Sequence, residues 1–235
     1  MTKKNEYLLF SGHLDELRHR LIKCILAVIF FSFLVYYFVE DILKFIVQPI
    51  GKVVFTAPAD AFVVYLTLTM FSGALLSFPV ILYQFWCFVA GGLKPDERKY
   101  ALAYGPFSLL FFLFGGAFAY FIIMPVSLKF LLSFSNDIIV PMITIKSYVS
   151  FVGTTVIIFG VIFELPLVLM FLTKIGIATP DFLIQKRKYA IVLIFIISAI
   201  VTPPDMVSQL MMAGPLMVLY EIGIWASKLV KKRNF

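Results

Sequence analysis

Residues Phe151–Leu172 read FVGTTVIIFGVIFELPLVLMFL, and this stretch decides the fold. It is long enough to cross the ~30 Å hydrocarbon core of a bilayer as an α-helix, and Glu164 is its only charged residue. A carboxylate near the middle of such a span is costly, so it marks a functional site unless it is hydrogen-bonded for packing within the protein. Pro166 follows two residues later and is expected to bend the helix.

The composition of the whole chain indicates the same class of protein. Hydrophobic residues make up 62% of the sequence, charged residues 14%, and the mean hydropathy is +1.01. A soluble domain of 235 residues cannot bury that much apolar surface, so we predict an all-α polytopic membrane protein. Cys24 and Cys87 fall near the cytoplasmic ends of predicted spans, so we expect buried, unpaired thiols rather than a disulfide.

Six apolar segments are predicted to be transmembrane helices. They are Ile22–Val39, Phe62–Val89, Ala101–Met124, Tyr148–Leu172, Tyr189–Val201 and Met206–Ser227. With both termini in the cytoplasm, 16 of the 20 basic residues lie on the cytoplasmic side and four lie outside, which predicts this orientation. Residues 1–235 then form a single transmembrane domain, with an amphipathic N-terminus (1–21), a six-helix core (22–227) and a basic tail (228–235).

The predicted spans are unequal and bent. The fifth has 14 residues between Lys188 and Pro203, about 21 Å of helix, and the sixth reaches Glu221 after 15 residues, so we expect both helices to be short. Prolines inside spans each remove a backbone hydrogen bond, so we expect kinked helices that form a curved, concave scaffold. These prolines are Pro79, Pro106, Pro166 and Pro215.

The two long outer loops, Glu40–Ala61 and Pro125–Ser147, are expected to form a cap on the outer face. Both have room for short amphipathic helices. In the first loop, apolar residues from Ile42 to Ile46 alternate with polar ones in a helical pattern that Pro49 ends.

The segment Ser11–Lys23, SGHLDELRHRLIK, leads into the first span. Its leucines recur at i, i+3 and i+7 while charged residues occupy the other faces, which predicts an amphipathic helix at the cytoplasmic interface. Glu16 either pairs with Arg20 one turn later and anchors this helix, or receives a ligand.

Further acidic residues stand in two connections. In Gly91–Tyr100, Asp96 and Glu97 either cap the third helix or place a carboxylate on the same membrane face as Glu16, which suits a guanidinium ligand. The turn Thr202–Asp205 (TPPD) is either a rigid cap for the sixth helix or a polar patch that hydrogen-bonds a partner helix within the membrane.

Several chemistries find no support in the sequence. There is no P-loop, dinucleotide fingerprint or H-E-x-x-H motif, and His13 and His19 are six residues apart, on different faces of a helix. We therefore expect no cofactor, no metal site, no nucleic-acid partner and no enzymatic activity.

Taken together, these residues resemble the TatC family, the multi-spanning receptor subunits of the twin-arginine protein translocase. The resemblance runs from Ser11 to about Trp225. It rests on H-L-x-E-L-R-x-R at His13–Arg20, Glu97-Arg98, the lone Glu164, and TPPD before Gln209. It implies a multi-pass protein of the cell inner membrane that binds twin-arginine signal peptides. It also implies assembly with single-span TatA- and TatB-type subunits, as a homo- and hetero-oligomer, and export of folded proteins by the proton-motive force.

The resemblance also implies roles for individual residues. The signal-peptide site comprises Glu16, Glu97, Arg18 and Phe88. The partner-binding patch comprises Thr202, Asp205 and Gln209. Glu164 is an intramembrane polar site and Pro49 shapes the first outer loop.

Two other classes of protein remain open from the residues alone. A proton-coupled secondary transporter would use Glu164 as its titrating carboxylate, although no internal repeat of the kind common in transporters is evident. A membrane assembly scaffold without cargo recognition would leave the cytoplasmic acids dispensable.

Overall fold

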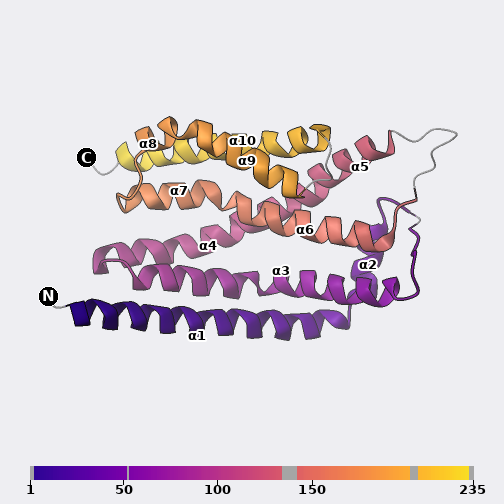
Figure 1. The fold of residues 1–235 in the computed structure, drawn as a ribbon, viewed down its shortest axis with the longest axis horizontal. Coiled ribbons are helices and arrows are strands. Elements are labelled where there is room, and N and C mark those ends of the chain that lie inside the picture. Colours follow the sequence, from indigo (N-terminus) through magenta and orange to yellow (C-terminus); the bar gives the residue numbers. More distant parts are fainter. Residues whose placement is uncertain (1–2, 52, 134–141, 202–205, 233–235) are drawn as a thin grey trace.

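The computed structural model describes residues 3–51, 53–133, 142–201 and 206–232, with side chains for all of these except 3–13, 95–97, 102, 201, 207–208 and 231–232. Every regular element in these ranges is a helix, and five helical segments are long and apolar enough to cross a membrane. The two ends of the described chain lie at the same end of the bundle (Figure 1). The all-α membrane fold is confirmed, whereas the count of six spans stays a prediction.

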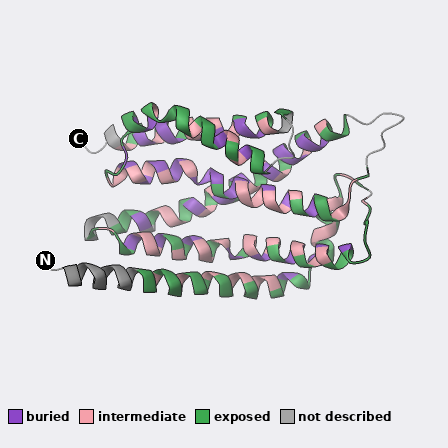
Figure 2. Cartoon of the chain, viewed as in Figure 1, coloured by how far each residue is buried: buried purple, intermediate pink, exposed green. Residues whose placement is uncertain are grey.

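The first two long helices, α1 (Lys3–Tyr36) and α3 (Asp60–Gly91), lie side by side (Figure 1). The segment Ser11–Lys23, predicted as a helix that enters the first span, is helical and forms part of the continuous α1, while its position at the membrane interface stays a prediction. The segment contains no proline, and its leucines and charged residues are good helix formers, so nothing interrupts the helix. Only 6% of the apolar window of α1 is buried, and most of the described residues of α1 are exposed (Figure 2).

The third predicted span is a longer composite of α4 (Pro95–Phe118), the π-helical turn η1 (Ala119–Ile123) and α5 (Met124–Leu132). It crosses the bundle diagonally (Figure 1). The predicted end at Met124 is therefore wrong: the helix continues through Pro125. Its ring would clash with the carbonyl four residues earlier in a regular α-helix, and the wider π turn just before it, closed by Met124 N–H to Ala119 O, relieves that conflict.

The fourth predicted span is broken, as expected from Pro166. It consists of α6 (Ile145–Phe163) and α7 (Leu165–Lys174), with Glu164 between them. Pro166 has no backbone N–H to donate within a helix. Two residues before it, α6 ends in a tight turn in which Glu164 N–H donates to Val161 O at 3.1 Å. The break places α6 against α4 and α3, and α7 against α10 (Met206–Lys232).

The last part of the chain folds as α8 (Pro180–Gln185), α9 (Arg187–Val201) and α10. The 15 residues of α9 span about 22 Å, which agrees with the predicted short fifth helix. The prediction of a short sixth helix is wrong, because α10 has 27 residues and continues past Glu221. Glutamate is a good helix former, and the Glu221 carboxylate, within this helix, accepts a hydrogen bond from Arg187 Nη2 at 2.7 Å.

The outer loops form the predicted cap in the part of the chain that is described. The short helix α2 (Val39–Val47) ends two residues before Pro49, and Gly51 then takes a positive φ of 82°. Val54 forms a bridge to Thr144, which joins the two outer loops. Tyr148 Oη donates to Ile46 O at 2.9 Å, so α6 holds α2 in place.

Candidate functional site

Glu164 lies where α6 ends, inside the bundle. Its side chain is buried, with a relative exposure of 9%, and Oε2 accepts a short hydrogen bond from Ser108 Oγ of α4. Oε1 is buried too and has no hydrogen-bond partner among the described residues. Leaving such an atom without a hydrogen bond costs about 1–3 kcal/mol, so Oε1 is a natural acceptor for a donor beyond the described side chains.

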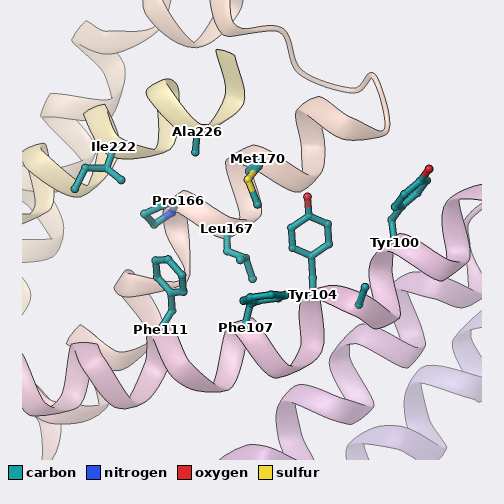
Figure 3. Close-up of a pocket in the computed structure, with 10 residues that line it drawn as sticks. Tyr100, Tyr104, Phe107, Phe111, Pro166, Leu167, Met170, Ile222 and Ala226 are labelled. Carbon is teal, nitrogen blue, oxygen red and sulfur yellow. The ribbon is translucent and has the colours of Figure 1, made fainter. Parts of the chain in front are cut away.

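An apolar groove of about 390 Å³ lies on the α7 side of Glu164, between α4, α7 and α10. Tyr104, Phe107 and Phe111 lie on one face of α4, and Leu167 and Met170 of α7 lie opposite them (Figure 3). Glu164 is not among the residues that line this groove. The groove therefore offers apolar contacts, and the carboxylate remains a separate polar site.

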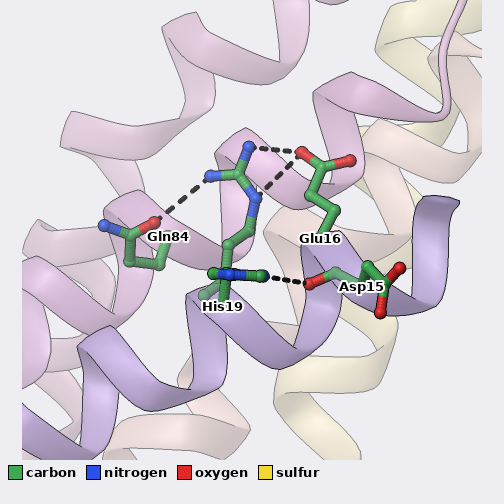
Figure 4. Close-up of polar contacts among 5 residues, drawn as sticks. Asp15, Glu16, His19 and Gln84 are labelled. Carbon is green, nitrogen blue, oxygen red and sulfur yellow. Dashed lines mark hydrogen bonds and ion pairs between the residues drawn. The ribbon is translucent and has the colours of Figure 1, made fainter.

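At the other candidate site, the Glu16 carboxylate of α1 holds a guanidinium. Arg20 donates from Nη2 and Nε to Glu16 Oε1 at 2.5 and 3.0 Å, and from Nη1 to Gln84 Oε1 of α3 at 3.2 Å (Figure 4). The two side chains are partly exposed, at 34% for Glu16 and 23% for Arg20. The i, i+4 pairing that the sequence left open is thus formed, and the site accepts a guanidinium sterically and electrostatically.

The face of α3 beside Glu16 carries the predicted Phe88 together with two residues that sequence reasoning missed, Gln84 and Gly91. Gln84, Phe88 and Gly91 recur at i, i+4 and i+7, which places them on one side of the helix. A Cβ atom built on Gly91 would lie 3.2 Å from Glu16 Oε2, so the glycine gives the carboxylate room against α3. A search for polar and small residues one turn before and one turn after Phe88 would have found Gln84 and Gly91.

Two predicted members of this site, Arg18 and Glu97, are not seen in contact with Glu16 among the described side chains. Arg18 is exposed and, two residues after Glu16, lies on a different face of α1. Glu97 belongs to the first turn of α4, but its side chain lies outside those that the structure describes.

The predicted partner-binding patch is described only at Gln209. Its Nε2 donates to Phe195 O at 3.0 Å and so connects α10 to α9. Thr202 and Asp205 lie outside the described residues. Among the described residues, no group of three or more His, Cys, Asp and Glu side chains is arranged to hold a metal ion, and both cysteines are free.

Comparison with known proteins identifies the family. The profile described as "Sec-independent protein translocase protein (TatC)" matches residues 12–215. The chain belongs to the TatC family. It is 41% identical over 228 residues to TatC of Carboxydothermus hydrogenoformans, which covers 95% of this chain and 94% of that protein. It is 37% identical to TatCd of Bacillus subtilis over 100% of this chain and 96% of that one.

A solved structure supports the same assignment. The crystal structure of a "Twin Arginine Translocase Receptor- TatC" superimposes with a TM-score of 0.86 at 38% identity, covering 93% of this chain and 99% of that chain. This TatC protein is therefore a multi-span component of the Sec-independent protein translocase in the cytoplasmic membrane. The secondary-transporter alternative is not favoured by this family membership.

Proposed function

We propose that this TatC protein is the receptor for twin-arginine signal peptides and that Glu16 receives a guanidinium of the peptide. The proposal rests on one observation: the Glu16 carboxylate accepts hydrogen bonds from two N–H groups of the Arg20 guanidinium. A signal-peptide arginine would share or replace this pairing. Arginine suits such a site better than lysine because its planar fork donates along two directions.

The other parts of the proposed site follow from the family. Glu97 would provide the second carboxylate, and Phe88 and Arg18 would border the bound peptide. Support for Phe88 comes from its position on the same face of α3 as Gln84. We further propose that residues 1–235 form one transmembrane domain with cytoplasmic termini.

Binding of peptides to the detergent-purified protein tests this site. A twin-arginine peptide should bind tightly, and its lysine–lysine counterpart weakly. Glu16→Gln should weaken binding of the arginine peptide roughly 10- to 100-fold, the value of a hydrogen bond to a charged group. Asp15→Asn is the matched control, because Asp15 is an exposed acid one residue earlier on the same helix. Equal losses in the two variants, or equal binding of both peptides, would overturn the assignment.

We also propose that the protein assembles with single-span TatA- and TatB-type subunits through Glu164, Thr202, Asp205 and Gln209. The assembled complex would export folded proteins, driven by the proton-motive force. The unpartnered Oε1 of Glu164 supports a role in accepting a donor from a partner helix. Glu164→Ala should reduce crosslinking to the single-span subunit while peptide binding persists. Crosslinking at the wild-type level would remove Glu164 from that interface.

A further inference from the structure

The groove between α4, α7 and α10 has the form of a binding site for a slender apolar ligand. Its volume of about 390 Å³ lies within the ~300–1,000 Å³ of small-molecule pockets. Its rim is open to the surroundings of the bundle, since Phe107 is 58% and Ile222 48% exposed. In a membrane protein, those surroundings are lipid.

The groove has a cationic end. Tyr100, which lines it at the first turns of α4, carries two lysine ammonium groups over its ring. Lys174 Nζ of α7 lies 4.9 Å from the ring centroid, and Lys99 Nζ lies 5.6 Å from it. Both lysines belong to segments that the basic-residue asymmetry places at the cytoplasmic surface. The groove therefore passes from apolar side chains through an aromatic ring to two positive charges.

We propose that this groove binds one anionic phospholipid of the cytoplasmic leaflet. One acyl chain lies along Phe107, Leu167 and Met170, and the phosphate lies between Lys99 and Lys174. The order of apolar, aromatic and cationic groups matches the order of chain, glycerol and phosphate in such a lipid. The negative surface potential of that leaflet favours the same pairing.

The cationic end of the groove argues against an apolar partner helix as its occupant, because such a helix provides no negative charge to pair with Lys99 and Lys174. A phospholipid provides both an acyl chain for the apolar part and an anionic phosphate for the lysines. The proposal is independent of signal-peptide recognition, because the groove and the Glu16 cluster share no residue.

Native mass spectrometry of the full-length, detergent-purified protein tests the cationic end. The protein is titrated with dioleoylphosphatidylglycerol or with dioleoylphosphatidylcholine. We expect one tightly held phosphatidylglycerol and weaker binding of phosphatidylcholine. The double variant Lys99→Gln/Lys174→Gln should weaken phosphatidylglycerol binding roughly tenfold or more, at about 1 kcal/mol for each lysine near the headgroup.

A matched control is available at Tyr189. Lys186 and Lys188 lie 5.2 and 5.1 Å from its ring centroid, yet neither they nor Tyr189 line the groove. Lys186→Gln/Lys188→Gln removes the same charge and should leave the tightly held lipid in place. An equal loss in both double variants, or no preference for phosphatidylglycerol in the wild type, would overturn the proposal.

A second pair of variants tests the apolar part. Ala226→Trp fills the groove from α10 and should displace the lipid, whereas Ala199→Trp, at an exposed position on α9, should not. Inorganic phosphate in excess should fail to displace the lipid, because the acyl chain provides part of the affinity. Displacement by phosphate alone would mean that the lysines bind a free anion and that the groove holds no lipid.

Discussion

α1 approaches closely at Gly73 of α3, and Gly73→Ala therefore tests the packing of α1, the helix that carries Glu16, against α3. A Cβ atom at residue 73 would lie 2.7 Å from both Cα and N of Ser32. These are backbone atoms, so they cannot move aside without moving α1 itself. Overpacking of this kind costs about 1–3 kcal/mol, a fall of roughly 5- to 150-fold in the ratio of folded to unfolded protein.

Gly214→Ala provides the matched control. Gly214 lies within α10, and a Cβ atom there would meet nothing within 4 Å. Alanine is favoured over glycine inside a helix by about 1 kcal/mol, so this variant should keep or raise the free energy of unfolding. The same substitution is thus expected to act in opposite directions at the two sites.

Unfolding of the detergent-purified protein by a titration with sodium dodecyl sulfate measures both free energies. Maleimide labelling of Cys24 on α1, in a Cys87→Ser background, reports separately on movement of α1. Gly73→Ala should lower the free energy of unfolding and label faster than the background protein. Equal free energies for Gly73→Ala and Gly214→Ala, with unchanged labelling, would refute the close approach of α1 to α3.

Two further predictions concern polar contacts between helices. Ser108→Ala should lower the free energy of unfolding by about 1–3 kcal/mol, because it takes from the buried Glu164 its hydrogen-bond donor. Ser77→Ala should lower the free energy of unfolding less in the same titration, since that buried hydroxyl donates to Ala74 O of its own helix at 2.9 Å. Equal losses for Ser77→Ala and Ser108→Ala would contradict the role of Ser108. Arg187→Gln breaks a half-exposed pair with Glu221 and should lower the free energy of unfolding by at most about 1 kcal/mol. This loss should shrink in 1 M salt, and a loss that does not depend on salt would show that Arg187 acts through packing.

The helix breaks illustrate what a local pattern can and cannot predict. Pro166 predicted the interruption at Glu164, because proline removes a backbone donor wherever it occurs. The third apolar segment was predicted to end at Met124, whereas the helix continues through Pro125, because the preceding π turn accommodates the ring. Pro79, Pro106 and Pro215 lie within helices that continue past them. The cost of a proline depends on whether the surrounding turns can adjust, which the sequence does not reveal.

The candidate site likewise contains some features that the sequence predicts and others that it does not. Glu16 and its pairing with Arg20 could be predicted, since both lie one turn apart on a single helix. Gln84 and Gly91 could not, because they reach Glu16 only through the contact of α3 with α1. Glu164 was conspicuous in an uncharged span, but its bond to Ser108 crosses from one helix to another 56 residues away in sequence.

The sequence by itself determined the membrane-spanning class, the unequal distribution of basic residues along the chain, the position of the main helix break and the face of α1 that carries Glu16. Each of these depends on composition or on a repeat within one helix, and both are local properties. Only the tertiary structure decided which helices touch, and hence that Ser108 meets Glu164 and that an apolar groove ends at Lys99 and Lys174. In a bilayer, hydrophobicity does not select among helix pairs. Close packing at small residues such as Gly73, together with a few hydrogen bonds between helices, sets the arrangement, and these appear only when the side chains are placed in space.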